Sequence, residues 1–398
     1  MNILYLSIAL HHLSQKSAFG DLAKEFIKNG HNVKIVAPMV SESIEGVNIE
    51  DGIEVFRFKT DQLIGNTSMI KKGLAYMKLI YQYPKAINKY CSGHKIDLII
   101  SHSLPPEIGI IVKRLKKKYN AKFYLMLCEY IWQDSVSLGF FKKNSLICKY
   151  YQHLEKTNIK TADYIGCPSQ GNIDFVLKLY PWAINKNIHI LHYSQSPIEL
   201  SNTNQKKEEI RAKYNLNNKF LAIYGGTLGI AQKIEYILDL AESCLDYENI
   251  VFILLGKGSA YNAIKQEVNN RKLNNILFLN FMPRDEYFQL LSACDVGLVV
   301  LNEKLAVPNI PSKTIAYFNL SIPVVASIDY ITDYGLYLES AKAGLWSYSG
   351  DIERFKENLL KLYNSPELRK EMGQNGYNFY MEHMLPEKAY QTIIDHIK

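Results

Sequence analysis

Short apolar runs alternate with longer amphipathic stretches along the first half of the chain. The apolar runs predict strands at 2–7, 32–38, 53–60, 97–102, 122–130, 163–168 and 188–193. Helical periodicity occupies much of the sequence between them, at 18–29, 69–90, 106–119, 145–160 and 171–179. Strands rich in β-branched residues that alternate with helices indicate βαβ units and a parallel sheet.

The same alternation starts again after a polar stretch, Ser196–Lys207, which predicts a linker. Further strands are predicted at 219–225, 250–255, 276–281, 295–301, 322–328 and 344–348, and terminal helices at 351–363, 366–380 and 386–397. We therefore expect an α/β protein with two Rossmann-like domains, residues 1–195 and 208–380. A C-terminal helix in 381–398 is expected to pack back toward the N-terminal domain. Ligands of such sheets bind at the carboxyl ends of the strands, so we expect the two domains to face each other across a cleft.

The composition fits a folded intracellular protein. The 398 residues, 47% apolar and 21% charged, are enough for two separate cores. The sequence at Met1–Leu6 does not resemble a secretory signal, and no run of 18 apolar residues predicts a transmembrane helix. The six cysteines are scattered without a C-x-x-C pair, which favours a reducing cytoplasm and argues against structural zinc.

Charge is shared unequally between the two halves. Residues 1–195 contain 25 Lys and Arg against 15 Asp and Glu, whereas residues 196–398 contain 21 against 24. A basic first half indicates an anionic partner, which is nucleic acid, a diphosphate or the cytoplasmic face of a membrane. A lysine-rich solvated surface is the plainer interpretation.

One basic segment, Met69–Tyr90, combines lysines with Met, Leu, Ile and Tyr. It predicts either an amphipathic helix on an anionic bilayer or a packed domain helix with a wet basic face. Phe140–Lys143 extends the same surface in the first interpretation. No RNA-recognition pattern is present, so we expect no nucleic-acid partner.

Two loops in the second half have the composition of anion-binding loops. Pro311-Ser312-Lys313 follows a buried strand and leads into a helix, an arrangement suited to holding an anion. Residues 225–229, Gly-Gly-Thr-Leu-Gly, also follow a strand, and glycines let backbone N–H groups approach a phosphate closely. A tight strand-to-helix turn would explain the glycines equally well. Gly256-Lys257-Gly258-Ser259 lacks the first glycine of a P-loop, which argues against an ATPase.

Other motifs narrow the chemistry further. His102 follows a buried strand, where it would bond a sugar hydroxyl or a phosphate or, alternatively, serve only the structure. Gly166–Gly171 does not have the spacing of a nucleophile elbow, which argues against a hydrolase. The sequence contains neither H-E-x-x-H nor the Asp-x-Asp pair with which metal-dependent sugar transferases hold a divalent ion.

Taken in order, the motifs resemble those of retaining GT-B glycosyltransferases of the large family-4 type, closest to bacterial enzymes of capsule and O-antigen synthesis. The similarity covers nearly the whole chain and rests on residues 28–35, 132–139, 161–169, 225–232, 294–297, 308–313, 346–352 and 372–376.

This resemblance implies transfer of a sugar from a nucleotide diphosphate, UDP first among the candidates, with retention of configuration and with no metal or organic cofactor. Lys313 would neutralise the leaving diphosphate, and His102 would orient the sugar and stabilise charge. The donor-binding residues would be Gly225, Gly226, Thr227, Gly229 and Gln232 at the diphosphate, Gly256 and Gly258 near the nucleoside, Phe281, Met282 and Pro283 at the base, and Pro311, Ser312 and Lys313 in the lysine loop. The acceptor side would contain Ser17, Glu129, Tyr130 and Trp132.

The chain departs from the family pattern in three places. Two glutamates eight positions apart in many relatives correspond here to Pro308 and Ala316, so the ribose contact is unassigned. Thr227 and Gln232 replace an arginine and a lysine of the glycine-rich loop. The first-domain loop, which commonly contains Gly-Gly in relatives, has the sequence Gln15-Lys16-Ser17-Ala18 here.

We therefore expect a cytoplasmic enzyme, peripheral on the inner face of the membrane, that adds one sugar to a polyprenyl-diphosphate-linked oligosaccharide. The alternatives are a catalytically silent GT-B subunit that binds a partner transferase and a non-hydrolysing sugar-nucleotide 2-epimerase. An RNA-binding function is the least favoured interpretation.

Overall fold

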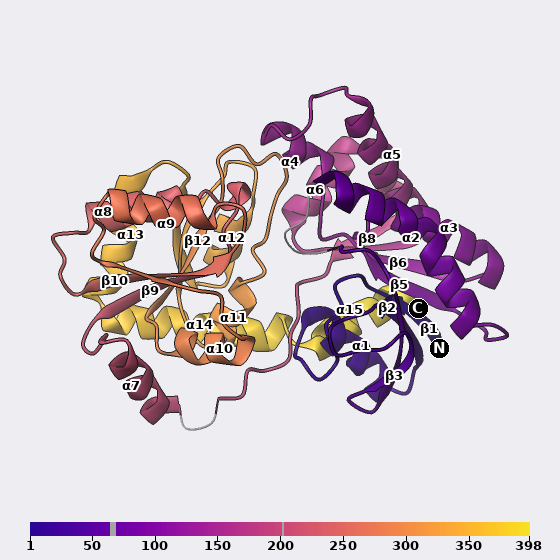
Figure 1. Ribbon diagram of the computed structural model, residues 1–398, viewed down its shortest axis with the longest axis horizontal. Helices are drawn as coiled ribbons and strands as arrows, with labels where there is room; N and C mark the ends of the chain where they lie inside the picture. Colours follow the sequence, from indigo (N-terminus) through magenta and orange to yellow (C-terminus); the bar gives the residue numbers. More distant parts are fainter. Residues whose placement is uncertain (64–68, 201–202) are drawn as a thin grey trace. The chain divides into compact units, whose positions relative to one another are not determined.

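The computed structural model describes residues 1–63, 69–200 and 203–398, and the chain divides into two compact units (Figure 1). Unit 1 comprises Met1–Ser196 together with His383–Lys398, and unit 2 comprises Pro197–Glu382. Residues 383–398 thus return to the unit in which the chain begins. Each unit is built on one sheet, and the two are described separately.

Unit 1 contains a sheet of eight strands in the order β3-β4-β2-β1-β5-β6-β7-β8. All neighbouring pairs are parallel except β3 and β4, which are antiparallel. The strands are β1 (Asn2–Leu6), β2 (Asn32–Pro38), β3 (Gly46–Glu50), β4 (Ile53–Phe58), β5 (Leu98–His102), β6 (Lys122–Met126), β7 (Tyr164–Cys167) and β8 (Asn187–Ile190).

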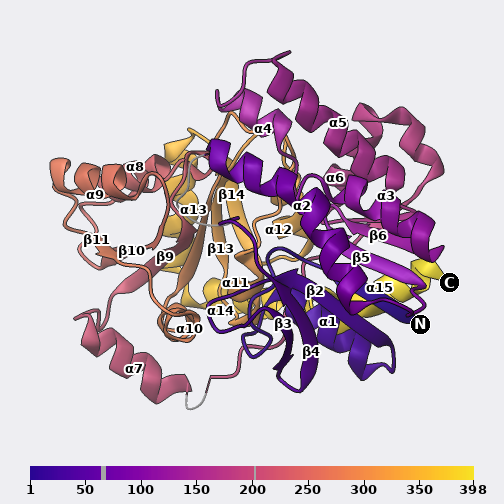
Figure 2. The same ribbon diagram turned by 45° about the vertical axis from the view of Figure 1, so that its right-hand side comes forward.

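Helices cover this sheet and contribute to its core. They are α1 (Ala18–Lys28), α2 (Met69–Tyr90), α3 (Ile108–Tyr119), α4 (Trp132–Ser137), α5 (Leu146–Thr161), α6 (Gln170–Leu179), the 3-10 turn η1 (Pro181–Asn185) and α15 (Pro386–Ile397). The last of these packs beside α1, and its Ala389 and Ile393 belong to the same buried cluster as Tyr5 and Phe26 (Figure 2). Residues from the two ends of the chain therefore share one core.

Unit 2 contains a six-stranded sheet in the order β11-β10-β9-β12-β13-β14, with every pair parallel. The strands are β9 (Phe220–Thr227), β10 (Ile250–Lys257), β11 (Ile276–Leu279), β12 (Val296–Val300), β13 (Val324–Ile328) and β14 (Gly344–Tyr348). The helical elements are α7 (Thr203–Lys213), η2 (Ile230–Gln232), α8 (Glu235–Ser243), α9 (Tyr261–Asn270), α10 (Arg284–Ser292), α11 (Thr314–Asn319), α12 (Tyr334–Ser340), α13 (Ile352–Asn364) and α14 (Pro366–His383).

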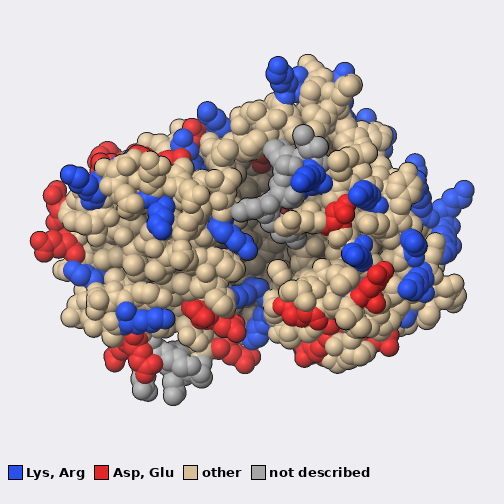
Figure 3. Space-filling model, viewed as in Figure 1, with Lys and Arg blue, Asp and Glu red and all other residues tan. Residues whose placement is uncertain are grey.

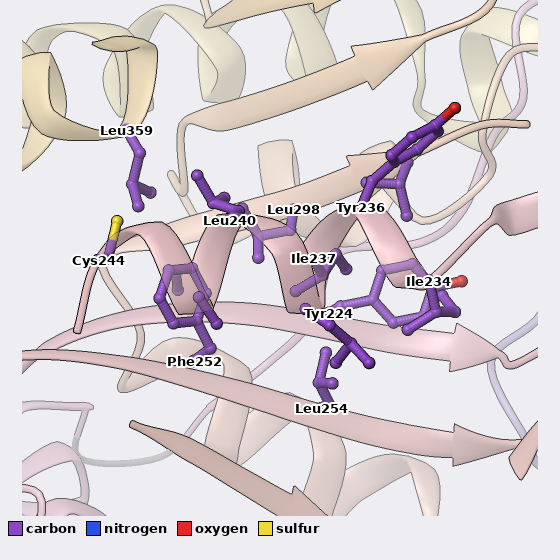
Figure 4. Close-up of a cluster of buried hydrophobic side chains, with 14 of the residues drawn as sticks. Tyr224, Ile234, Tyr236, Ile237, Leu240, Cys244, Phe252, Leu254, Leu298 and Leu359 are labelled. Carbon is purple, nitrogen blue, oxygen red and sulfur yellow. The ribbon is translucent and has the colours of Figure 1, made fainter. Parts of the chain in front are cut away.

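The core of unit 2 forms where α8 packs on the sheet. Figure 4 shows Ile237 and Leu240 of this helix in one buried cluster with Phe252 and Leu254 of β10. All four are fully buried. At about 25 cal/mol per Å² of apolar surface removed from water, such side chains contribute most of the force that holds the sheet and helices together. The predicted α/β class with parallel sheets is confirmed.

Several local predictions were wrong. The predicted linker, Ser196–Lys207, overlaps α7, which begins at Thr203; residues 201–202 lie outside the described part of the chain. The strand predicted over 122–130 ends at Met126 because Leu127 and Cys128 leave the ladder. The antiparallel edge strand β3 and the six-residue helix α4 were not predicted, since both are too short to show clear periodicity.

The helix α2 meets the description of a packed domain helix. Its Leu79, Tyr83 and Ile87 are fully buried, whereas its Leu74 and Tyr81 remain more than half exposed. None of the helices in the described ranges has the length and apolar character needed to cross a bilayer.

Histidines line the contact between α15 and the sheet of unit 1. The ring of His189 on β8 stacks on His396 of α15 with the centroids 3.5 Å apart, and its Nε2 lies 2.7 Å from the Tyr124 hydroxyl. His192 lies near His383, with the ring centroids 5.6 Å apart. His383 is the first residue of the C-terminal segment that belongs to unit 1. Burial, reinforced by the neighbouring histidine, lowers the pKa of His189 to about 4 and that of His192 to about 4. Both rings are therefore neutral in the folded protein at pH 7.

These histidines predict that unit 1 loses stability in mild acid. In the unfolded chain both groups take up a proton near their usual pKa of about 6.5, so stability declines as the pH falls from about 6.5 to about 4. We expect the unfolding temperature to fall over this range by roughly 2–4 °C for each kcal/mol lost, measured by calorimetry. The double variant His189→Gln/His192→Gln should make the profile less steep, with the part due to the buried His102 remaining, whereas His94→Gln, at an exposed position, should leave it unchanged. An equally steep profile in the double variant would contradict the prediction.

Candidate active site

The glycine-rich loop of unit 2 continues from paired strands. The strands β9 and β10 remain in register to their ends, with Gly226 opposite Gly256. At Gly256 the backbone φ is +154°, and a Cβ would lie 1.8 Å from the Gly226 carbonyl oxygen. At Gly258 a Cβ would lie 2.2 Å from the Leu228 carbonyl oxygen. Only glycine permits this approach, so both residues shape the glycine-rich loop through the backbone.

The Lys313 ammonium lies directly beside this loop. Its Nζ is 3.3 Å from the centroid of the Tyr224 ring, and a Cβ added to Gly226 would lie 3.4 Å from it. The Lys313 side chain is partly exposed, but burial of its ammonium end lowers the pKa well below the usual 10.5. In the described residues no carboxylate forms an ion pair with this ammonium. A cation held over a π face, next to glycine backbone and without its own counter-ion, is suited to receive an anion.

Two further side chains fix the shape of the glycine-rich loop. The Tyr224 hydroxyl donates to the Thr227 carbonyl oxygen at 2.7 Å. Asn302, 4% exposed, donates from its backbone N–H to Ala231 O at 2.9 Å and from Nδ2 to Ile230 O at 2.8 Å, which ties η2 to the end of β12. Neither Tyr224 nor Asn302 was a predicted site residue. A polar residue directly after a buried strand was the only sequence signal for Asn302.

The remaining predicted donor residues surround the same end of the sheet. Gln232 ends η2, and its Oε1 would lie 3.0 Å from a Cβ added to Gly229. Gly225 lies against the Tyr287 ring, which leaves no room for a side chain. In the lysine loop Pro311 is buried and Ser312 is exposed.

The predicted nucleobase segment, Phe281-Met282-Pro283, lies between β11 and α10. Phe281 is 61% exposed, and the Lys257 Nζ lies 4.2 Å from its ring centroid. Lys257, which ends β10, was not predicted as a site residue. The exposed ring and its lysine form a flat surface beside the glycine-rich loop.

The positions of the two missing glutamates offer no replacement carboxylate. Ala316 is buried on α11, and Pro308 lies in the loop that precedes it. The nearest end of the neighbouring strand β13 contributes Asp329, whose Oδ1 accepts hydrogen bonds from the backbone N–H groups of Ile331 and Thr332 at 2.8 Å each. One oxygen of that carboxylate is thus used in its own turn, whereas its Oδ2 is buried and has no hydrogen-bond partner among the described residues.

In unit 1, His102 is enclosed at the end of β5 and is only 3% exposed. The Leu104 N–H donates to its Nδ1 at 3.3 Å, so the ring proton is on Nε2, which lies 2.9 Å from the Ser7 Oγ. Phe19 stacks on the ring with the centroids 4.3 Å apart. Burial lowers the pKa of His102 to about 3, and the ring is neutral. Such a histidine can orient or donate a hydrogen bond, but it does not carry positive charge at pH 7.

The predicted acceptor-side residues have different surroundings. Ser17 caps α1, because its Oγ accepts from the Gly20 N–H at 3.2 Å. The Trp132 indole N–H donates to Glu155 Oε1 at 3.2 Å, which fixes α4 on α5. Tyr130 is 9% exposed and packs edge-on against Phe175. These three residues therefore support the local structure.

Glu129 is the acceptor-side residue whose carboxylate stays available. Its backbone N–H donates to Ser103 Oγ at 2.9 Å, but no hydrogen bond or ion pair engages its carboxylate within the described ranges. Burial raises the pKa of Glu129, and that of the nearby Glu107 to about 7. Burial raises the pKa of the Tyr76 hydroxyl to about 12, and charge interactions with Glu129, Tyr151 and Glu107 add to this rise. This carboxyl pair, including the unpredicted Glu107, can accept hydrogen bonds from a polyhydroxylated ligand.

A buried ion pair holds the loop between β1 and α1. Arg57, with no exposed surface, donates from Nε to Glu50 Oε1 and from Nη2 to Glu50 Oε2, both at 2.8 Å. Its remaining N–H groups donate to the carbonyl oxygens of Leu10 at 3.0 Å, His11 at 3.0 Å and Pro38 at 2.9 Å. One guanidinium thus fixes two backbone segments, Leu10–His11 and the end of β2 at Pro38, at the carboxyl edge of the sheet. Across residues 1–63, 69–200 and 203–398, no cluster of His, Cys, Asp and Glu is arranged to hold a metal ion.

A comparison with known protein families finds a match within unit 2. Residues 206–379 match the family described as glycosyl transferases group 1. This segment is therefore similar to group 1 glycosyl transferases. It contains the glycine-rich loop, Lys313, Asn302 and the nucleobase segment.

Similar proteins extend this likeness beyond residues 206–379. An uncharacterised glycosyltransferase of Methanocaldococcus jannaschii is 26% identical over 322 residues, which are 80% of this chain and 79% of that protein. The chitobiosyldiphosphodolichol beta-mannosyltransferase of Dictyostelium discoideum is 29% identical over 133 residues, 33% of this chain and 25% of its own length.

Solved structures show the same fold. The sucrose-phosphate synthase of Thermosynechococcus elongatus has a TM-score of 0.74 at 14% identity and covers 99% of this chain and 97% of its own. The Anabaena protein HepE in complex with UDP has a TM-score of 0.67 at 15% identity, with 100% of this chain and 99% of its own covered. The predicted GT-B fold class is confirmed.

Proposed function

We propose that this chain is a glycosyltransferase that moves a sugar from a UDP-linked donor, with retention of configuration, to a lipid-linked oligosaccharide in the synthesis of a surface polysaccharide. The observation that carries the proposal is the Lys313 ammonium, which lies over Tyr224 and beside the glycine-rich loop and has no counter-ion among the described residues. When the bond between the sugar and the diphosphate breaks, negative charge grows on the leaving oxygen. A cation already in place stabilises that charge without reorganisation.

The proposed ligand is a nucleoside diphosphate, because the glycine-rich loop for the diphosphate and the Phe281 surface for the base lie side by side. The glycine-rich loop at the end of β9 and the Phe281 surface after β11 flank the end of β10. A diphosphate at the first and a flat base at the second would span this one edge of the sheet. The similar fold of HepE, whose structure contains UDP, supports the same choice.

The acceptor is proposed from unit 1 and from one relative. Glu107, which is buried, and Glu129, which is exposed, offer carboxyls to sugar hydroxyls at the ends of β5 and β6. The similarity to a transferase named for a chitobiosyl-diphosphodolichol acceptor supports a sugar chain on a polyprenyl-type diphosphate.

The function is tested by incubating the purified chain with UDP-hexoses, UDP-N-acetylhexosamines and GDP-hexoses, and by measuring the released nucleotide. We expect slow hydrolysis of at least one UDP-sugar, without added metal, and faster release in the presence of a polyprenyl-diphosphate-linked acceptor. No release from any donor, together with no heat of binding to UDP, would exclude the proposal.

Pro308 and Ala316 favour one alternative, a catalytically silent subunit, because the carboxylates that many relatives use are absent. The same experiment separates the two functions. A silent subunit would bind UDP without releasing it from any donor, and an epimerase would convert the UDP-sugar itself without an acceptor.

Membrane association is proposed from an exposed apolar surface on unit 1, here termed the α2–α5 patch. Its side chains are all at least 46% exposed and come from α2, from the loop before α5 and from the first turn of α5: Leu74, Met77, Tyr81, Phe140, Leu146 and Ile147. The two segments are adjacent, because a Cβ added to Gly73 of α2 would lie 3.8 Å from the Tyr151 hydroxyl of α5. Tyr151 in turn stacks on Phe141, with ring centroids 5.5 Å apart.

Lysines surround the α2–α5 patch. Lys78, Lys142, Lys143 and Lys149 are exposed, and Figure 3 shows basic side chains over the part of unit 1 that contains α2, α3 and α5. Apolar side chains ringed by lysines suit the surface of an anionic bilayer, into which the former insert while the latter meet the head groups.

We expect the protein to cosediment with vesicles that contain anionic phospholipid, and less so with neutral vesicles or at high salt. Because each fully inserted Leu or Tyr contributes about 1.5–3 kcal/mol, the double variant Leu74→Ser/Leu146→Ser should weaken partitioning at least about tenfold. Leu336→Ser, on the exposed face of α12 in unit 2, is the matched control. Equal partitioning of the double variant and the wild type would rule out this surface.

A further inference from the structure

A groove runs along the edge of the sheet in unit 2, apart from the glycine-rich loop. The strand β14 is the last in the sheet order and is separated from β9 by β12 and β13. The groove has a volume of about 360 Å³. Glu339 of α12 lines one side, and Asp351, Arg354 and Asn358 at the beginning of α13 line the other. Neither the group 1 match nor the donor chemistry assigns a role to this place.

Aromatic rings form one wall of the groove. Trp346 and Tyr348 are two residues apart on β14 and so lie on the same face of the sheet, with ring centroids 5.2 Å apart. Tyr330 stacks on Tyr348 with the centroids 4.5 Å apart and the planes at 20°. Tyr348 is 44% exposed and Tyr330 is 66% exposed. Contiguous aromatic surface left open to water is typical of a binding site.

The Trp346 ring is held rigidly. It packs against Gly335 of α12, where a Cβ would lie 2.5 Å from the ring, and its indole N–H donates to Glu339 Oε1 at 2.9 Å. Its backbone carbonyl accepts from Asn358 Nδ2 at 2.9 Å. Because this outward-facing carbonyl is already satisfied, the edge of β14 is not open to an added β-strand at its centre. The aromatic wall, rather than the backbone, is the feature offered to a ligand.

The polar groups of the groove are mostly hydrogen-bond acceptors. Glu339 and Asp351 bring two carboxylates, in each of which one oxygen already accepts a hydrogen bond, from the Trp346 indole N–H and from the Arg354 backbone N–H at 3.0 Å. The one guanidinium that lines the groove, that of Arg354, pairs with Glu357 at 2.8 Å. The Ser347 hydroxyl is buried and has no hydrogen-bond partner among the described residues. This charge balance disfavours a phosphate, a nucleotide or an acidic sugar. It suits hydroxyl groups, which donate to carboxylates.

We propose that this groove binds a neutral oligosaccharide, as a glycan-binding site separate from the donor site. A pyranose ring presents an apolar C–H face, which would lie against the exposed surface of Tyr348, with Tyr330 extending the aromatic surface beside the groove. Its rim of hydroxyls would donate to the remaining acceptor positions of Glu339 and Asp351. A glycan held at this edge stays near the enzyme between transfers, which raises its effective concentration. The proposal goes beyond the donor chemistry and does not depend on Lys313.

The test uses the full chain and three neutral ligands, maltohexaose, cellohexaose and chitohexaose, with tetragalacturonate as the acidic comparison. Saturation-transfer NMR detects binding of each oligosaccharide, and calorimetry gives its affinity. We expect at least one neutral hexaose to bind with millimolar affinity or tighter and tetragalacturonate to bind more weakly. UDP binding and donor hydrolysis are measured on the same samples, so a failure of this site is distinguishable from a failure of the proposed function.

Variants at exposed positions locate the binding. Tyr348→Ala and Tyr330→Ala should each weaken the affinity for the oligosaccharide about tenfold, as expected for the loss of a stacking surface. Both should keep the wild-type unfolding temperature and UDP affinity. Leu336→Ala, 65% exposed on α12, is the control and should bind the oligosaccharide like the wild type. Absence of binding of all three neutral ligands to the wild type, or unchanged binding in both tyrosine variants, would overturn the proposal.

Discussion

Replacement of Lys313 by alanine should abolish most of the turnover of the donor while leaving the fold intact. Loss of a preorganised cation at a developing oxyanion typically costs about 100- to 1,000-fold in kcat, and we expect this range in nucleotide-release assays. Stability should respond in the opposite direction. The Lys313 ammonium is enclosed, and no carboxylate in the described chain pairs with it, so its removal should leave the unfolding temperature unchanged or raise it.

The charge-retaining variant Lys313→Arg separates electrostatics from packing and should recover part of the activity. Lys265 is an exposed lysine of α9, so Lys265→Ala is the matched control and should retain full activity.

Burial lowers the pKa of Lys313 in the free protein, whereas a bound diphosphate favours the charged amine. UDP binding in alkaline buffer should therefore be accompanied by proton uptake in the wild type and not in Lys313→Arg. Full turnover in Lys313→Ala would remove the central support for the proposed function.

Replacement of Glu50 by alanine should be the most destabilising single change in unit 1. It leaves the Arg57 guanidinium buried without its carboxylate, which typically costs about 3–5 kcal/mol. The carbonyls of Leu10, His11 and Pro38 depend on the same guanidinium, so the loop between β1 and α1 should loosen first. Denaturant unfolding measures the loss of free energy, and hydrogen exchange measures the opening of this loop.

The exposed ion pair between Lys24 and Asp51, with the side chains 30% and 54% exposed, provides the comparison. Asp51→Ala should cost less than about 1 kcal/mol, because water screens that pair. The double variant Glu50→Leu/Arg57→Met should be more stable than Glu50→Ala alone, since no unpaired charge remains buried. A loss in Glu50→Ala as small as that in Asp51→Ala would show that the buried pair contributes little.

The sequence predicted the long elements of the fold because burial on both faces gives parallel strands continuous apolar runs. The run from Val296 to Leu301 is of this kind, and β12 is buried throughout. The antiparallel strand β3 lies at an edge and exposes Val47 and Ile49, so burial imposes no such run on it. The strand β6 was predicted to continue past Met126 because Leu127 is also buried, although its backbone has left the ladder. Burial and strand pairing are different properties, and the pattern reports only the first.

The site was predictable where backbone chemistry dictates the residue type. Gly256 and Gly258 are required by their close approach to neighbouring carbonyls, and Lys313 follows from the loop into α11. Contacts between distant positions were not predictable. Tyr224 supports Lys313 across 89 positions of sequence, and Asn302 holds Ile230 across 72. The enclosure of His102 beneath Phe19 likewise depends on tertiary packing, which a strand-end histidine alone does not reveal.

The return of residues 383–398 to unit 1 has a consequence for how the protein is made. On the ribosome, unit 2 can complete its core before unit 1 does. The strands of unit 1 are synthesised earlier, but their core remains incomplete until Ala389 and Ile393 have been synthesised. The half that is translated first is therefore the last to mature, and a nascent chain stalled before α15 would present the apolar side of α1 to chaperones.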